Sequence, residues 1–248
     1  WQVRDELIAA GLSGGDSAAV ATAMRAAGRL PLGVAGDLDF DAEQAKADAV
    51  VKAALEILNG EEQVRRQIQG QVGTVLFGGR IDGLFSGGRV RLSASKPDGV
   101  RHLQVWVRHL ACTVLDPSYG GEAWLVCPKG KDEAEVVRFP AVPIDDARTH
   151  LADLMAIYLA GRWVPLPFAP NTSFLWSKTD PAVALEKAEA AWPNDSDGGR
   201  DDHVQCVFGA ALPDGALTHL GISLPDKLTF QQVSKRVFGP MLTALAQS

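Results

Sequence analysis

Two residues between positions 78 and 96 have the types and spacing needed for phosphodiester hydrolysis. The segment GGRIDGLFSGGRVRLSASK predicts a strand, a Gly-Gly turn and a second strand, with Asp82 on the first and Lys96 at the end of the second. Metal-dependent nucleases use this layout because the reaction needs oxygen ligands for Mg²⁺ and a cation near the attacking water. They also need an acid two residues before the Lys, and Ala94 stands there.

The residues around Ala94 do not replace the missing acid. Side chains alternate along a strand, so residues 94 and 96 would share the face beside Asp82. Ala94 has no ligand atom, and Asp98 follows Lys96 in a turn. We therefore expect no metal site, and a cross-strand ion pair between Asp82 and Lys96 worth about 0.2–1 kcal/mol. The alternative is an active Mg²⁺ nuclease whose second acid comes from another element.

The elements around this hairpin predict an α/β (α+β) fold with a mixed central sheet flanked by helices. Strands are expected near 73–85 and 88–95, and again at AWLVCP and EVVRFP. Apolar residues at helical spacing predict a helix that Asp41 caps, a second across residues 103–114, and a third that ends at Gly161.

The last third of the chain contains two helix-start signals. Asp180-Pro181 is a typical N-cap and first helical residue, and Thr229 with Gln232 forms a capping box. We expect Gly239-Pro240 to interrupt the last helix, and residues 203–210 to form a strand.

Two domains are predicted. Residues 1–40 are rich in Ala and Gly with weak periodicity, which favours an arm linking to a missing upstream part rather than a core. Residues 41–248 form the predicted nuclease-like domain. The chain starts with Trp1 instead of Met, so we expect it to be an excised part of a longer protein.

Composition limits the classes of function. The net charge of −6 argues against a free-standing DNA binder, which is usually basic. Cys112, Cys127 and Cys206 lie far apart without a CxxC pair, which argues against a disulfide framework and a structural zinc site. No apolar run approaches the roughly 18 residues of a membrane span. A cytoplasmic protein without a cofactor is expected.

The hairpin segment, followed by RHLQVWVRHLACTVL, resembles the PD-(D/E)xK restriction-endonuclease-like fold of the RecB-like kind. In that family a Gln on the helix after the Lys supports the site, and Gln104 matches it. Further segments resemble the C-terminal region of the RecC family, the gamma subunit of bacterial exodeoxyribonuclease V: GRLPLGVAGDL, LAGRWVPLPFAPNTSFLW, ALEKAEAAW, an acidic loop and RVFGPMLTAL.

The RecC resemblance implies a nuclease-like domain that has lost its catalytic acids. No catalytic residue is then expected, and the vestigial positions would be Asp82, Ala94, Lys96 and Gln104. It also implies RecB-type and RecD-type partner subunits, and DNA as the substrate of a helicase–nuclease that processes double-strand ends during recombinational repair. RecC would contribute strand separation and guidance, while the partners hydrolyse ATP and cut DNA.

Two groups of residues are weaker candidates for contacts. Phosphate contact is expected from the basic stretch: Arg80, Arg89, Arg91, Lys96, Arg101 and Arg108. Subunit contact is expected from apolar residues of the Pro-aromatic segment and the last helix: Trp163, Phe168, Phe174, Trp176 and Phe238. A pure assembly scaffold without DNA contact is a further alternative, which the negative net charge favours.

Overall fold

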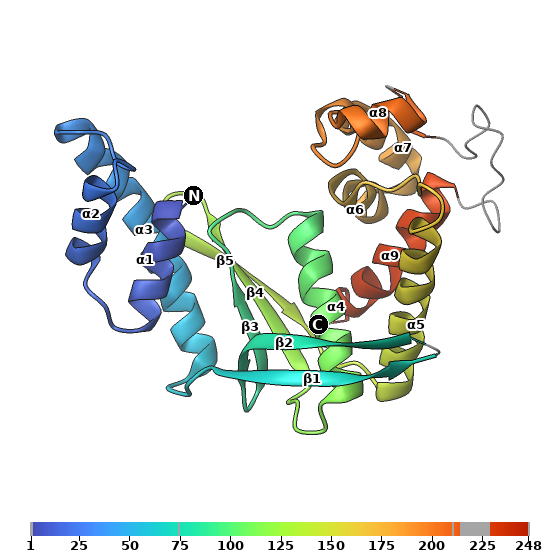
Figure 1. Cartoon of the computed structure of the whole chain (residues 1–248), viewed down its shortest axis with the longest axis horizontal. Helices are drawn as coiled ribbons and strands as arrows, with labels where there is room; N and C mark the ends of the chain where they lie inside the picture. The colour runs from blue at the N-terminus through green and yellow to red at the C-terminus, as the bar shows by residue number, and fades with distance from the viewer. Residues whose placement is uncertain (1, 74, 210, 214–228, 248) are drawn as a thin grey trace. The chain divides into compact units, whose positions relative to one another are not determined.

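The structure is a computed structural model that describes residues 2–73, 75–209, 211–213 and 229–247 (Figure 1). The helices in this part are α1 (Gln2–Leu12), α2 (Ser17–Ala26), α3 (Val34–Leu58), α4 (Gly99–Leu115), α5 (Ile144–Gly161), α6 (Pro170–Lys178), α7 (Pro181–Ala191), η1 (Trp192–Asn194), α8 (Asp202–Phe208) and α9 (Phe230–Leu245). The strands are β1 (Val64–Val72), β2 (Val75–Phe85), β3 (Gly88–Leu92), β4 (Glu122–Lys129) and β5 (Glu133–Phe139). None of the helices described is long and apolar enough to cross a bilayer.

The five strands form one mixed sheet in the order β1-β2-β3-β4-β5. Strand β3 runs antiparallel to β2 and parallel to β4, and β4 and β5 are antiparallel. A parallel pair needs a crossover, and the chain between β3 and β4 contains α4. The expected α+β class with a mixed central sheet is therefore confirmed, and it is consistent with a nuclease-like fold.

The chain divides into two compact units. Unit 1 comprises residues Trp1–Gln67, Gly79–Pro97 and Ser118–Phe139. Unit 2 comprises Ile68–Gly78, Asp98–Pro117 and Pro140–Ser248. The hairpin formed by β1 and β2 contributes residues to both units.

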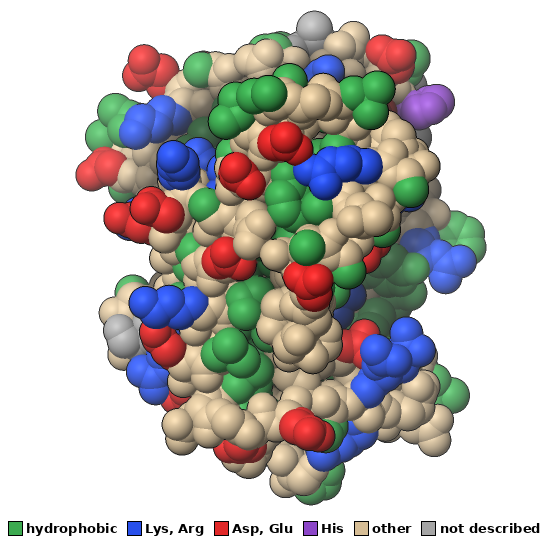
Figure 2. Space-filling view, turned by 90° about the vertical axis from the view of Figure 1, so that its left-hand side faces the viewer, with side chains coloured by type: hydrophobic (Ala, Val, Ile, Leu, Met, Phe, Trp, Pro, Cys, Tyr) green, Lys and Arg blue, Asp and Glu red, His purple; other side chains and the backbone are tan. Residues whose placement is uncertain are grey.

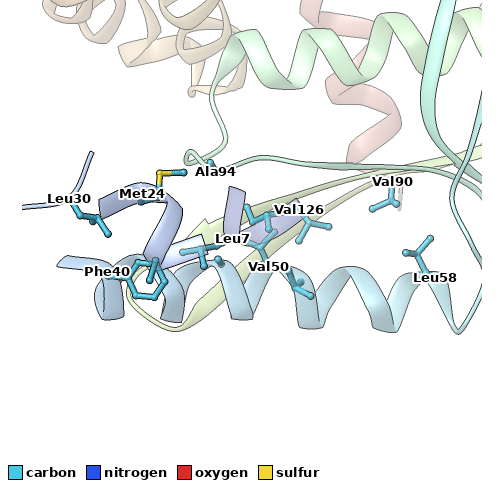
Figure 3. Packing of buried hydrophobic residues seen from close by; sticks show 13 residues of the cluster. Leu7, Met24, Leu30, Phe40, Val50, Leu58, Val90, Ala94 and Val126 are labelled. Carbon is cyan, nitrogen blue, oxygen red and sulfur yellow. The ribbon is translucent and has the colours of Figure 1, made fainter. Parts of the chain in front are cut away.

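The core of unit 1 lies between helix α3 and strands β3, β4 and β5. Figure 3 shows this apolar cluster, in which Val50 of α3 packs with Val90 and Val126 of the sheet. Leu7 of α1 and Met24 of α2 are buried in the same cluster. The first 40 residues thus contribute to a core instead of forming a separate arm. Their link to an upstream part stays a prediction, and the boundary at residue 40 falls inside α3.

Unit 2 is a group of packed helices. Helix α4 packs against α5 and α6, and α9 packs against α5 and α6. Its core contains the fully buried aromatic side chains of Trp106 on α4, Trp192 on η1, and Phe230 and Phe238 on α9. At the start of α4, a Cβ on Gly99 would lie 2.2 Å from the carbonyl oxygen of Pro170, so only Gly allows α4 and α6 to approach this closely.

Several local predictions are confirmed. A two-residue turn, Ser86-Gly87, joins β2 and β3, and Gly88 adopts a φ of +146° that favours Gly. The Asp180 side chain caps α7 by accepting from the backbone N–H of Ala182. Thr229 and Gln232 form the expected capping box at the start of α9. These signals act within four residues, so sequence alone specifies them.

Four local predictions are wrong. Helix α3 begins at Val34, seven residues before Asp41, because Gly33 with a φ of 71° ends the preceding segment. Strand β3 ends at Leu92 and does not reach residue 95. The strand predicted at 203–210 is replaced by helix α8 over 203–208, whose N-terminal amides are capped by Asp201, and residue 210 lies outside the described residues.

The fourth error concerns the last helix. Helix α9 continues through Pro240, although proline in a helix interior costs about 3 kcal/mol. Its buried residues Val237 and Met241 lie on either side of that proline, and the helix packs against α6. Burial of this face offsets the local cost of the proline.

Candidate nuclease-like site

Asp82 is an exposed carboxylate on β2, and arginines surround it. Its Oδ1 lies 2.6 Å from Nε of Arg65 on β1 and 3.7 Å from Nε of Arg80 on its own strand. The side chains of Asp82, Arg65 and Arg80 are more than half exposed, at 56%, 64% and 63%. The expected cross-strand pair of Asp82 with Lys96 is therefore replaced by a pair with Arg65.

This arrangement changes what Asp82 can do chemically. In a nuclease the corresponding carboxylate would use its oxygens to bind Mg²⁺. Here Oδ1 is already occupied by the Arg65 guanidinium, which supplies positive charge where a metal would supply it. A guanidinium has no acceptor atom, so Arg65 offers no base that could take a proton from a water molecule.

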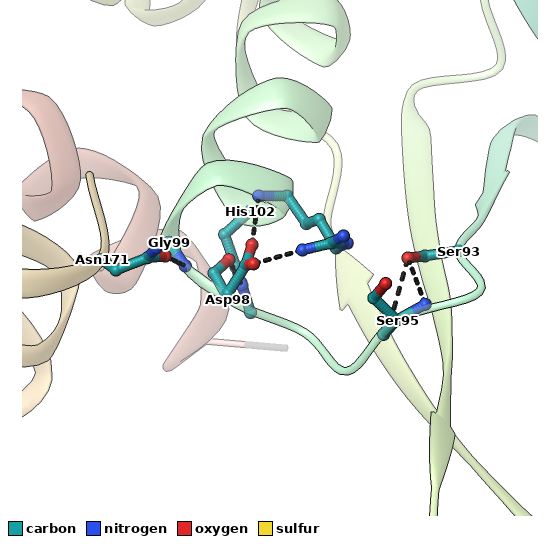
Figure 4. A network of polar contacts seen from close by, with 7 residues as sticks. Ser93, Ser95, Asp98, Gly99, His102 and Asn171 are labelled. Carbon is teal, nitrogen blue, oxygen red and sulfur yellow. Dashed lines mark hydrogen bonds and ion pairs between the residues drawn. The ribbon is translucent and has the colours of Figure 1, made fainter. Parts of the chain in front are cut away.

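Ala94 lies beyond the end of β3, in the apolar core of unit 1. Its side chain is 5% exposed and belongs to the cluster shown in Figure 3. The chain turns here, because Ser93 Oγ donates to the carbonyl of Ser95 and accepts from its N–H (Figure 4). Strand alternation therefore does not extend to residue 94. A carboxylate at this position would enter the core instead of an accessible metal site.

Long-range polar contacts hold the Ala94 turn in place. Arg4 of α1 donates a hydrogen bond to the carbonyl oxygen of Ala94. The same guanidinium lies 2.5 Å from Glu43 of α3, which also accepts from Lys46 at 2.8 Å. Burial by itself raises the pKa of Glu43, but the hydrogen bonds from Lys46 and Arg4 outweigh it and hold that pKa below its ordinary value.

The other residues predicted as vestigial positions do not complete a metal site among the described residues. Lys96 is exposed in the loop after β3. Asp98 caps α4, since its carboxylate accepts from the backbone N–H of Arg101 at 2.8 Å (Figure 4). Gln104 is exposed on α4, which belongs to unit 2, whereas Asp82 and Lys96 belong to unit 1. Across the described residues, no group of three or more His, Cys, Asp or Glu side chains could hold a metal ion.

The six residues predicted to contact phosphate belong to two different units. Arg101 and Arg108 belong to unit 2, and the other four candidates belong to unit 1. Arg89 is only 4% exposed, and its Nε donates to the carbonyl oxygen of Asp82 at 3.1 Å, so it supports the hairpin. Arg80, Arg91 and Lys96 are exposed and stay candidates for phosphate contact.

Sequence reasoning missed Arg65, the partner of Asp82. The signal that could have indicated this strand is the alternation of polar side chains along β1. Exposed residues stand at every second position there: Arg65, Gln67, Gln69 and Gln71. The chain as a whole is not basic, since its net charge is −6. Figure 2 shows a face on which Asp and Glu side chains are interspersed with Lys and Arg.

The candidates for subunit contact also divide. Phe174 and Phe238 are 7% and 0% exposed, and their rings lie 5.3 Å apart in the core of unit 2. These two side chains stabilise the unit itself and are not available to a partner. Trp176 and Phe168 are half-buried, and Trp163 is 87% exposed.

A model of the RecC C-terminal domain family matches residues 1–181. This chain belongs to the RecC C-terminal domain family.

A RecC protein with a curated description is similar to most of the chain. The RecBCD enzyme subunit RecC of Mycolicibacterium smegmatis is 32% identical over 192 residues, which cover 72% of this chain and 16% of that protein. The chain thus spans about a sixth of the length of that relative. In this RecC C-terminal domain, the family match includes the hairpin with Asp82, the Ala94 turn and helices α4 and α5.

Proposed function

We propose that this chain is the non-catalytic, nuclease-like C-terminal domain of a RecC-type subunit. The subunit would act in an exodeoxyribonuclease V helicase–nuclease, with RecB-type and RecD-type partners, on linear DNA ends during double-strand break repair. Its contribution would be strand separation or guidance and subunit assembly. Membership of the RecC C-terminal domain family supports the assignment to such a subunit.

The observation that carries the non-catalytic part is the burial of Ala94. A metal-dependent nuclease needs two oxygen-bearing side chains near one ion. Here the second position lies inside an apolar cluster, and the first, Asp82, is paired with Arg65. Hydrolysis of a phosphodiester without a catalyst is extremely slow, so even a poor active site would be measurable against this background.

A nuclease assay tests this proposal. The purified chain would be incubated with linear duplex and single-stranded DNA in Mg²⁺ or Mn²⁺, and the release of nucleotides would be measured. We expect none. The matched control is Asp82→Asn, which keeps the size of the side chain and removes its charge. Nucleotide release that disappears in Asp82→Asn would establish an active nuclease with its second acid on another element.

Contact with DNA is proposed for the exposed face of the β1–β2 hairpin. Arg65 and Arg80 stand beside each other around Asp82, and both guanidinium groups are largely exposed. Arginine forks match the geometry of phosphate oxygens, and the carboxylate between them fixes their spacing while reducing the local charge. Weak, salt-sensitive binding to the DNA backbone is the expected result.

A pure assembly scaffold is the second candidate function. The net charge of −6 and the mixed surface of Figure 2 favour it, because a phosphate-binding surface is usually basic. Surface variants of this chain that lose partner binding while their DNA binding stays unchanged would support the scaffold. Salt-dependent DNA binding that requires Arg65 and Arg80 would exclude it.

A further inference from the structure

An apolar groove of about 610 Å³ crosses the surface of unit 2. Helix α4 contributes Leu103 and Val107 to its lining, and α5 contributes most of the remainder. The groove is also lined by Leu166, Phe168 and, from α9, Val237. Neither the nuclease-like hairpin nor the predicted phosphate contacts use any of these side chains.

The groove leaves apolar side chains of α5 in contact with water. Tyr158 of α5 is 63% exposed, and Leu154 and Met155 are half-buried on the same helix. Trp163, at 87% exposed, follows directly after the lining residues Gly161 and Arg162. A contiguous apolar surface of this kind on a soluble protein usually indicates an interaction site.

The charge in the described lining of the groove is positive. Among the described residues that line it, Arg162 carries a charge, and none is Asp or Glu. On α4, Gln104 and Arg108 follow Leu103 and Val107 by one position each, so they stand on the flank of that ridge. Arg108 is exposed, and its Nη1 donates to the carbonyl oxygen of Gln104 at 3.1 Å.

We infer that this groove binds an amphipathic helix of a partner subunit, with apolar anchors facing α4 and α5 and an acidic side chain facing Arg162. The inference rests on the proposed function, which supplies the partner subunits, and it identifies the surface and the chemistry of the contact. A helix presents anchors at i, i+3 or i+4 and i+7 on one face, which suits a groove lined along two helices. An acidic flank is favoured because the charge in the described lining is positive.

The groove also replaces the expected subunit contact through Phe174 and Phe238. Those rings are buried in unit 2, and removing residues 163–248 would strip α4 of its contacts with α6. Loss of assembly after such a truncation would therefore report unfolding. Point substitutions at exposed groove residues separate partner binding from folding.

The test uses the full-length subunit with its purified RecB-type and RecD-type partners, and measures the Kd of each pair. Tyr158→Glu places an acid among the apolar anchors, and we expect binding of one partner to weaken by about tenfold or more. Arg162→Glu should weaken the same pair by about fivefold or more, whereas Arg162→Lys should keep most of the affinity. Lys187→Glu on α7 is the control, since it makes the same charge change on an exposed residue outside the groove lining.

The outcomes separate the inference from the proposed function. A wild-type subunit that binds neither partner overturns both. A wild-type subunit that binds its partners, with Tyr158→Glu and Arg162→Glu unchanged, overturns the inference and leaves the proposed function standing. The Tm of each variant subunit would also be measured without a partner. A lowered Tm in Tyr158→Glu would indicate that the subunit's own chain covers the groove. That result would also overturn the inference.

Photo-crosslinking identifies the occupant directly. Tyr158→benzoylphenylalanine keeps an aromatic ring at an exposed position of the groove lining. The complex would be irradiated and analysed by mass spectrometry. We expect a crosslink to a helical segment of one partner that carries apolar residues at helical spacing and an acid. A crosslink within the RecC-type subunit itself, or to a second copy of it, would contradict the inference.

Discussion

Arg65 and Asp82 face each other across strands β1 and β2, with the arginine Nε 2.6 Å from the carboxylate Oδ1. We propose that Asp82 stands where a nuclease would carry a metal-binding acid, and this carboxylate is paired with an arginine of the neighbouring strand. The residue that would complete the metal site is Ala94, in the core of unit 1. The pair with Arg65 gives Asp82 a structural role that does not require catalysis.

The Asp82 pair predicts that the chain binds Mg²⁺ and Mn²⁺ too weakly to be detected as a site. A site filled at a hundred times its Kd would raise the free energy of unfolding by about 2.7 kcal/mol. We expect thermal unfolding of the chain and of Asp82→Asn to respond identically to millimolar metal. A saturable rise in Tm that is lost in Asp82→Asn would contradict this prediction.

Replacing Ala94 with an acid should destabilise the chain without creating activity. The Ala94 side chain lies in the apolar cluster, so Ala94→Asp would bury a charge at a cost of about 3 kcal/mol. Urea unfolding at pH 7 measures the loss, and the loss should shrink at acid pH as the introduced carboxyl becomes neutral. Ala94→Asn is the control for size and polarity, and it should cost less at pH 7. Stable, metal-dependent DNA cutting by Ala94→Asp would refute the assignment of this position to the core.

The Glu43 network should make stability depend on acid pH. Hydrogen bonds from Lys46 and Arg4 hold the pKa of Glu43 below its ordinary value of 4.5. The unfolded chain therefore binds more protons than the folded chain between these two pKa values, so stability rises with pH there and is lost as pH falls through the folded pKa. Glu43→Gln should flatten this part of the stability curve, which denaturant titrations between about pH 3 and 6 would measure. An unchanged slope in Glu43→Gln would disprove the assignment.

Arg4 should matter more for stability than an exposed arginine. It joins α1 to Glu43 of α3 and to the carbonyl of Ala94, and its side chain is mostly buried. Arg4→Ala should cost about 2 kcal/mol of unfolding free energy, because a buried charge partner and a carbonyl lose their donor. Arg25→Ala, which removes an exposed pair with Asp37, is the control and should cost under about 1 kcal/mol. Equal costs for the two variants would show that the Ala94 turn does not depend on Arg4.

Arg65 and Arg80 should account for part of any DNA binding by the chain. Removing one phosphate contact reduces the slope of log K against log salt by about 0.9 on duplex DNA. The double substitution Arg65→Ala with Arg80→Ala should therefore weaken binding and lower the slope by about 2, as measured by fluorescence anisotropy across a salt series. The control pair, Arg25→Ala with Arg29→Ala, removes two exposed arginines from the same unit. If both double variants reduce the affinity for DNA equally, the β1–β2 hairpin is not a specific contact surface.

Local signals in the sequence were sufficient for much of the fold. The capping box at Thr229 and the Asp180-Pro181 start act between neighbouring residues, and both predicted helix starts are confirmed. The Gly-Gly hairpin and the helix across residues 103–114 are also confirmed, because turn chemistry and apolar periodicity are local. The resemblance to the RecC family, carried by segments across the chain, is supported by the family match.

The sequence by itself determined that position 94 carries no metal ligand, since an alanine side chain has no donor atom. Only the tertiary structure decided where that position lies and what holds Asp82. Ala94 is fixed by Arg4, ninety positions earlier in the chain, and Asp82 by Arg65 on the neighbouring strand. Contacts over such separations depend on how helices and strands pack, which short-range propensities do not specify. For the same reason, the burial of Phe174 and Phe238 and the groove between α4 and α5 appear only when the whole chain is folded.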